Sequence, residues 1–231
     1  GYKRRYKTDN PSWDDSMIRL TDLVRERVGD GAVVLDVGCG RGNFVIDELT
    51  ELFSEKIGFD ILAESVEGNM TCDRMILGQH SSLSLPDASV DVVVSLWVFE
   101  HLEKPEEVMK EIHRVLKPGG FLAFVTPNKK SFLISLRRLM SDGLAHRLLK
   151  VLYGREEKDA FHVYYRANTV QDILSLAKKT FFSTEILFEN EDPSYTSFNT
   201  LTYLASKVFT RLCGSAAHPH IIAILCKEKK C

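Results

Sequence analysis

Short apolar runs alternate with segments of helical spacing between residues 15 and 126 of the chain. The runs are hydrophobic at consecutive positions, as in strands that are buried on both faces of a parallel sheet. Strands are predicted at 32–37, 56–60, about 74–77, 90–95 and 121–126. Helices are predicted at 15–29, 43–53, near 62–69 and at 105–116. Strands and helices that alternate in this way form a parallel sheet covered by helices on both faces.

The alternation becomes less regular after residue 128. Residues 131–153 have the spacing of one long helix or two shorter ones. A helix is predicted at 168–179, a strand at 183–188 and a last apolar strand at 220–225. The polar and aromatic residues 1–14 are expected to form an arm over the domain, and 192–215 is a mixed region.

The composition is that of an ordinary soluble globular protein, with 44% hydrophobic and 27% charged residues among 231. The net charge of −2 gives no overall attraction to nucleic acid or to an anionic membrane. The five cysteines include no Cys-x-x-Cys pair, so we expect reduced thiols and a cytoplasmic location. No apolar run approaches the ~20 residues that cross a bilayer, and the basic N-terminus lacks the apolar segment of a signal peptide.

The stretch with the most chemical information is 33–42, Val-Val-Leu-Asp-Val-Gly-Cys-Gly-Arg-Gly. An apolar strand ends near Asp36, glycines follow at alternate positions, and an amphipathic segment begins at once, as in the nucleotide pocket of an open α/β sheet. Glycine lets the backbone turn sharply and approach a ligand closely. The next predicted strand ends in Asp60, twenty residues after Gly40, where a ribose-binding carboxylate is expected. The spacing Gly-x-Gly-x-Gly counts against the Gly-x-Gly-x-x-Gly of an NAD-dependent fold.

Three further features follow the glycine turn before residue 128: the turn Leu85-Pro86-Asp87, the pair Glu100-His101 after the fourth strand, and Arg-Val-Leu-Lys-Pro-Gly-Gly at 114–120. Together with the turn and its two acids, they resemble the class I S-adenosylmethionine (SAM)-dependent methyltransferases. The resemblance implies a Rossmann-like, doubly wound α/β sheet of seven strands. Six would be parallel, and the last strand would enter antiparallel beside the fifth. It also implies one domain over 1–231, in which 129–165 form an inserted helical cap.

The resemblance places SAM at the carboxyl ends of the strands. Asp36 would anchor the ammonium of the methionine part, directly or through water, and Asp60 would accept both ribose hydroxyls. Family members usually carry Asp at the position of Gln79, whose amide oxygen can still accept a hydrogen bond from the adenine amino group. The expected cofactor-binding residues are Asp36, Gly38, Cys39, Gly40, Gly42, Asp60, Ile61, Gln79, His80, Ser95 and Leu96.

The catalytic candidates are His101 and Glu100. Positioning contributes up to roughly 7–11 kcal/mol to a displacement at a sulfonium, and a hydroxyl acceptor usually also needs a general base. Two interpretations stay open: His101 acts as that base, or the pair only orients the following loop. Related enzymes bind a divalent metal with Glu-x-x-Glu-His. Here Trp97 stands at the first position of that pattern, so no metal is predicted.

The acceptor is expected to meet the end of the fourth strand and the segment 161–169, which holds the place of the family's lid. Trp97 lies at the substrate mouth, where its ring either faces a cation or forms a wall. The substrate-binding candidates of the segment are His162, Tyr164, Tyr165 and Arg166. Aromatic rings with an arginine suit a planar, sugar or anionic substrate. The alternative is a loop held in place by tyrosine packing.

Residues 129–150 carry six basic residues against one acid, interleaved with leucines and other apolar residues. A basic amphipathic helix is typical of a membrane surface. Two interpretations are open, a peripheral membrane contact and a cap helix with a solvated basic face.

These observations predict a SAM-dependent methyltransferase, with S-adenosylhomocysteine as product. The acceptor is expected to be a small molecule or a lipid- or glycan-linked compound, methylated at oxygen. Nucleic acid is not favoured, because Ser95-Leu96-Trp97-Val98 differs from the Asn/Asp-Pro-Pro-Tyr of amino-group nucleic-acid methyltransferases. The alternative is a SAM-binding partner or scaffold protein without catalysis. The oligomeric state is left open.

Overall fold

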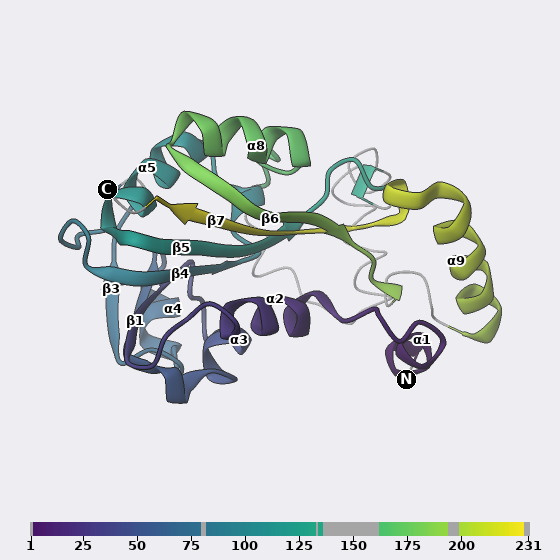
Figure 1. The fold of residues 1–231 in the computed structure, drawn as a ribbon, viewed down its shortest axis with the longest axis horizontal. Helices are drawn as coiled ribbons and strands as arrows, with labels where there is room; N and C mark the ends of the chain where they lie inside the picture. Colours follow the sequence, from purple (N-terminus) through teal and green to yellow (C-terminus); the bar gives the residue numbers. More distant parts are fainter. Residues whose placement is uncertain (1, 80–81, 133, 136–161, 194–198, 229–231) are drawn as a thin grey trace.

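A computed structural model describes the chain except for residues 1, 80–81, 133, 136–161, 194–198 and 229–231. Its centre is one seven-stranded sheet of order β3-β2-β1-β4-β5-β7-β6 (Figure 1). The strands are β1 Ala32–Val37, β2 Phe53–Asp60, β3 Arg74–Leu77, β4 Val90–Leu96, β5 Leu116–Pro127, β6 Phe182–Asn190 and β7 His220–Lys227. The predicted α/β fold is confirmed.

The strand directions follow the predicted pattern. β1 pairs in parallel with β2 and β4, and the strands β3 and β5 extend these pairs in parallel. β7 runs antiparallel to both of its neighbours, β5 and β6. The order reverses between β1 and β4, so a crevice is expected at the carboxyl ends of these two strands, where open α/β sheets bind their ligands.

Helices cover both faces of the sheet (Figure 1). They are α1 Tyr2–Asp9, α2 Ser16–Arg25, α3 Phe44–Asp47, α4 Ala63–Gly68, α5 Pro105–Val115, α8 Val170–Lys179 and α9 Thr200–Cys213. Because side chains alternate along a strand, β1 supplies Leu35 to one core and Val34 to the other. α5 and α8 pack on the first core, and α2 and α3 pack on the second. None of the described helices is long and apolar enough to cross a membrane.

Several predicted boundaries were wrong. The helix predicted at 43–53 is the short α3 followed by a 3₁₀ turn at Thr50–Leu52, because β2 already begins at Phe53 and pairs with Ala32. Pro118-Gly119-Gly120, a sequence typical of a turn before the strand predicted at 121–126, is absorbed into β5 as an irregularity, since Leu116 pairs with Val90 and Phe121 with Val92. A Cβ on Gly120 would lie 2.6 Å from the Asp91 carbonyl, so this crossing requires glycine.

The two ends of the chain are also more regular than predicted. The arm expected at 1–14 contains the helix α1, and the mixed region at 192–215 contains the helix α9, which begins with a capping box at Asn199. α1 and α9 contact each other through the buried rings of Tyr6, Trp13 and Tyr203. Most of the predicted cap lies outside the described residues, so the division into one domain with a cap at 129–165 stays a prediction.

Candidate functional site

Two carboxylates stand at the carboxyl ends of neighbouring strands. Asp36 lies in β1 and pairs with Gly58, and Asp60 is the last residue of β2. The Asp60 Oδ2 atom accepts the Gly40 N–H at 2.9 Å, and its Oδ1 atom accepts the Leu62 N–H at 2.9 Å. The second acid is therefore fixed against the glycine turn after the first strand, which brings the two motifs into one site.

Asp36 is a fully buried carboxylate with one oxygen satisfied. Its Oδ1 atom accepts a hydrogen bond from Asn43 Nδ2 at 2.9 Å, whereas Oδ2 has no partner. Burial raises the pKa of Asp36 to about 7; the Asn43 bond opposes this rise, and the charges of Asp60 and Asp47 add to it. A buried acceptor without a partner costs free energy, so this position favours a ligand that brings a cation or a hydrogen-bond donor.

The glycine turn is tightly packed at Gly38 and borders open space at Gly40. The N–H groups of Gly38 and Cys39 both donate to the Phe59 carbonyl, at 2.8 and 3.1 Å. Gly38 has φ +76°, and a Cβ there would lie 2.3 Å from Val98 Cγ2, so only glycine fits. Gly40 has φ +49°, but a Cβ at this position would meet nothing within 4 Å. The backbone at Gly40 therefore borders open space, as expected where a ligand approaches.

Asn69 and Thr71 support the turn from the loop after α4, and neither was predicted from the sequence. Asn69 Nδ2 donates to the carbonyls of Cys39 and Gly40 at 3.3 and 3.0 Å, and its Oδ1 accepts the N–H groups of Thr71 and Cys72. Thr71 Oγ1 accepts the Asn43 N–H at 3.0 Å. Nothing in the local pattern distinguishes these residues from ordinary polar loop residues.

The remaining cofactor candidates occupy different surroundings. Ile61 and Gln79 are exposed beyond the ends of β2 and β3, and the Gln79 carbonyl accepts the Ser82 N–H at 2.9 Å. Gly42 has φ +156°, and a Cβ there would lie 3.0 Å from Thr71 Oγ1. His80 lies outside the described residues. Leu96 is half-buried at the end of β4.

Ser95 is fully buried, and its hydroxyl has a structural partner. The hydroxyl donates to the Val37 carbonyl at 2.9 Å and so ties β4 to β1 at the crevice. The side chain predicted to face the cofactor is thus engaged within the sheet, and its contribution to binding stays a prediction.

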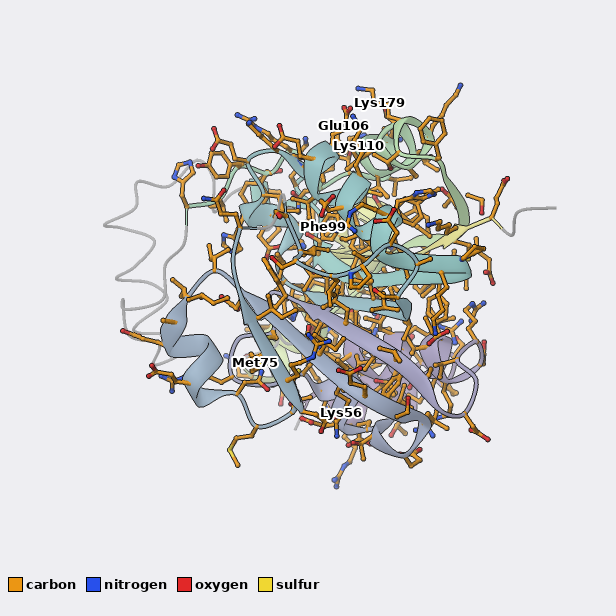
Figure 2. All side chains as sticks on the ribbon, turned by 90° about the vertical axis from the view of Figure 1, so that its left-hand side faces the viewer. Lys56, Met75, Phe99, Glu106, Lys110 and Lys179 are labelled. Carbon is orange, nitrogen blue, oxygen red and sulfur yellow. The ribbon has the colours of Figure 1, made fainter. Side chains whose placement is uncertain are left out.

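Glu100 and His101 belong to a short 3₁₀ turn, Phe99–His101, after β4. This turn is anchored by Phe99, which Figure 2 shows in the interior and whose ring stacks on Phe124 with 4.1 Å between centroids. Glu100 is 5% exposed, and its burial raises its pKa to about 7. The His101 Nε2 atom lies 3.9 Å from Glu100 Oε1.

The tautomer of His101 follows from its contact with the segment before α8. Its Nδ1 atom lies 2.9 Å from the His162 carbonyl, which can only accept, so Nδ1 carries the proton. Burial lowers the pKa of His101 below its ordinary value. The ring is therefore neutral near pH 7, with Nε2 as the atom that can take a proton.

A buried polar chain stands behind Glu100. Thr126 Oγ1 donates to Glu100 Oε2 at 3.2 Å and accepts from Asn168 Nδ2 at 2.6 Å. Asn168 is fully buried, and its Oδ1 atom has no partner. Residues from the ends of β4 and β5 and from the start of α8 thus fix the orientation of the carboxyl group. The sequence indicates Asn168 only as the start of the helix predicted at 168–179, and no local pattern points to Thr126.

The predicted lid residues contact two different parts of the loop after β4: Tyr164 and Tyr165 contact Glu100, and Arg166 contacts Glu103. The N–H groups of Tyr164 and Tyr165 both donate to the Glu100 carbonyl, at 2.8 and 3.1 Å, so this segment is fastened to the catalytic candidates. Arg166 donates to the Glu103 carbonyl at 2.6 Å, and its guanidinium lies 5.4 Å from the centre of the Tyr164 ring.

Arg166 also lines a cavity of about 630 Å³ between α5 and α8. Other residues of its wall, Glu106, Lys110 and Lys179, are grouped at the top of Figure 2. Arg166 therefore faces this groove between the helices, and its predicted contact with substrate stays untested.

Trp97 connects the end of β4 to the start of β7. It has φ +59°, its N–H donates to the Val125 carbonyl at 3.1 Å, and its ring meets that of His220 edge-on at 4.7 Å between centroids. His220 is buried beside Ser16, and burial lowers its pKa to about 4, so it is a neutral ring. These contacts favour Trp97 as a wall over an exposed cation-binding ring.

Comparison with known proteins identifies the domain. Residues 35–124 match the family described as methyltransferase domain. A protein of Mycolicibacterium smegmatis, named as a probable S-adenosylmethionine-dependent methyltransferase, is 37% identical over 120 residues, which are 49% of this chain and 46% of the relative. A malonyl-acyl carrier protein O-methyltransferase of Marinomonas sp. is 24% identical over 238 residues, covering 95% of this chain and 82% of the relative.

A crystal structure of a SAM-dependent methyltransferase from Mesorhizobium loti has the same fold. It matches with a TM-score of 0.61 at 16% identity, covering 92% of this chain and 98% of that chain. The first relative is matched over less than half of its own length. Residues 35–124 of the chain thus match a methyltransferase domain, in agreement with the class I SAM-dependent methyltransferases that its sequence resembles. Among the described residues, no group of three or more His, Cys, Asp or Glu side chains is placed to hold a metal ion.

Proposed function

We propose that the chain transfers a methyl group from SAM to an oxygen of a small-molecule or a lipid- or glycan-linked acceptor. The observation that carries the proposal is the buried Asp36 Oδ2 atom without a partner, beside a glycine turn whose Gly40 borders open space. An ammonium group or a water molecule held by it would satisfy this oxygen. The site thus fits the zwitterionic end of SAM.

The second acid fits the ribose. Each oxygen of Asp60 accepts one backbone N–H, which leaves further lone pairs for two hydroxyl groups. When bound, SAM supplies an activated methyl group on a sulfonium. The described residues then bind and orient the reactants.

His101 is the proposed general base for a hydroxyl acceptor. Its neutral ring is oriented by the His162 carbonyl, and Nε2 is the ring nitrogen that would take the hydroxyl proton. Glu100 is proposed as a positioning residue, because Thr126 and its own backbone bonds to the segment before α8 fix it beside the imidazole. Oxygen as the acceptor atom is further supported by the name of the O-methyltransferase relative.

Titration calorimetry with SAM tests the cofactor site. Asp36→Asn keeps an acceptor for Asn43 but removes the charge, and we expect it to weaken SAM binding by about 30-fold or more. Asp47→Asn is the matched control, since Asp47 is an exposed acid near the same turn, and its effect should stay below about threefold. Equal binding by wild type and Asp36→Asn would contradict the proposed site.

Turnover is tested separately. The release of S-adenosylhomocysteine is measured with a panel of hydroxyl-bearing acceptors and the amines that match them. SAM binding without release across the whole panel would favour the alternative, a SAM-binding partner or scaffold protein. Release only with the amines would contradict oxygen as the acceptor atom.

A further inference from the structure

The helix α9 exposes a continuous apolar stripe that the proposed reaction does not use. Leu201, Leu204, Val208 and Leu212 are 77%, 50%, 58% and 79% exposed. With 3.6 residues per turn, these four positions lie along one side of the helix. Isolated exposed leucines are ordinary, but a row of four on one helix marks an interaction surface.

Cations border this stripe on the side of α1. Going around the helix from Tyr203, which packs against α1, one meets Lys207, then Arg211, and then the apolar stripe. α9 contains no acidic residue. On its opposite border, Phe209 contacts the ring of Phe132 at 5.5 Å between centroids, which adds a further apolar residue that is half exposed.

The neighbouring helix α1 extends the positive charge. Its sequence Tyr-Lys-Arg-Arg-Tyr-Lys-Thr-Asp has one acid, Asp9, and Lys207 pairs with that acid at 2.8 Å. Arg5 lies over the Tyr203 ring, 4.9 Å from its centroid, so its charge stays close to α9. The two lysines of α1, Lys3 and Lys7, pair with Asp15 and Asp14. Arg4, Arg5 and Arg211 form no ion pair with a described carboxylate, so the arginines supply the positive charge of this surface.

The helices α9 and α1 lie near the end of the sheet that carries the candidate site. β7 begins at His220, soon after α9, and pairs there with Pro127 at the end of β5. Figure 1 shows α9 and α1 beyond this end of the sheet, standing out from the layers that cover it. The carboxyl ends of the parallel strands point the same way, so this surface lies at the end of the molecule that carries the candidate site.

We propose that α9, with the arginines of α1, docks onto an anionic lipid surface. An apolar stripe on a helix without acids, flanked by arginines, is complementary to acyl chains beneath negatively charged headgroups. A second copy of the chain would bring the same basic flank and a helix without carboxylates to pair with it. Charge complementarity therefore favours an anionic lipid surface over a dimer. Of the basic segment 129–150, Phe132 touches this surface, and most of the segment lies outside the described residues. The proposal rests on α9 and α1, and it does not depend on the proposed methyl transfer.

Co-sedimentation of the full chain with vesicles tests the proposal. We expect binding to phosphatidylcholine vesicles that contain phosphatidylglycerol, weaker binding to phosphatidylcholine alone, and a decrease as salt screens the charges. Leu201→Gln with Leu212→Gln should lower the partition onto anionic vesicles at least about tenfold. Arg211→Gln should lower it about fivefold on anionic vesicles and hardly at all on neutral ones.

A matched control is available on α8. Leu174→Gln with Lys178→Gln makes the same kinds of change at exposed positions of another helix, and should bind vesicles as the wild type does. Thermal melting confirms that each variant folds. Absence of wild-type binding to anionic vesicles, or binding that the α9 variants leave unchanged, would overturn the proposal. If a concentration-dependent dimer disappears in those variants while vesicles are not bound, the stripe belongs to a second copy.

Discussion

The two ends of the candidate site are built in different ways. The cofactor end is local, because Asp36, Asn43, Asp60, Asn69 and Thr71 hold one another within a single β-α-β-α segment. The acceptor end joins Glu100 and His101 to Thr126 and to residues 162–168, which are far apart in the sequence. Local motifs can therefore specify a binding turn, whereas the geometry of a base depends on the packing of several elements.

Substitution of the proposed base should have the largest effect. His101→Asn removes the imidazole while the cofactor end is untouched, so turnover should fall by about 100- to 1,000-fold with SAM affinity unchanged. Steady-state release of S-adenosylhomocysteine and calorimetry measure the two quantities. Full activity of this variant would leave Glu100-His101 as a structural pair, the second interpretation of the sequence.

Asn69 tests whether the cofactor end is as self-contained as its hydrogen bonds indicate. Asn69→Ala removes four hydrogen bonds at the turn and should lower the free energy of unfolding by about 1–3 kcal/mol. SAM affinity should fall about tenfold, because the turn is less well fixed.

Asn69→Asp is the informative companion variant. It keeps the acceptor for Thr71 and Cys72 but loses the donor to the carbonyls of Cys39 and Gly40. It should retain more stability than Asn69→Ala while still weakening SAM binding. Wild-type affinity in both variants would show that the turn needs no support from this loop.

Glu100 should give the acceptor end a pH-dependent stability. Burial raises its pKa from the ordinary 4.5 to about 7, so the folded state keeps a proton that the unfolded state releases between these values. Its contribution to stability is present below pH 4.5 and is lost as the pH rises through 7.

Glu100→Gln measures this contribution. Between pH 5 and pH 8, the free energy of unfolding of the variant should rise by about 1–3 kcal/mol relative to that of the wild type. Urea unfolding at each pH measures this difference. Asp36 and His220 titrate in both proteins, so their effects cancel in the comparison. An identical pH dependence for the two proteins would refute a raised pKa at Glu100.

Ser95→Ala should have the smallest effect. The hydroxyl is engaged with the Val37 carbonyl, so we expect a loss of about 1 kcal/mol in stability and less than about threefold in SAM affinity. Calorimetry and urea unfolding measure both. A large loss of affinity at unchanged stability would return Ser95 to the cofactor contacts that the sequence analysis assigned to it.

Much of the sheet and of the cofactor end could be predicted because each feature is encoded locally. The strand predicted at 74–77 has the observed bounds, and the glycine spacing after Asp36 required a tight turn. The helix predicted at 43–53 was too long, since apolar spacing does not show that Phe53 already pairs with Ala32. At the ends of the chain, α1 and α9 were missed because their packing partners are nearly 200 residues apart.

The sequence by itself determined the alternating α/β order, the acids at the ends of β1 and β2, and the glycine turn between them. Periodicity and the conformational freedom of glycine act over a few residues, so they can be read without the fold. Only the tertiary structure decided that the His162 carbonyl sets the tautomer of His101, and that α9 shows its leucines at the end of the molecule that carries the site. Those features depend on contacts between distant segments, which a linear pattern does not contain.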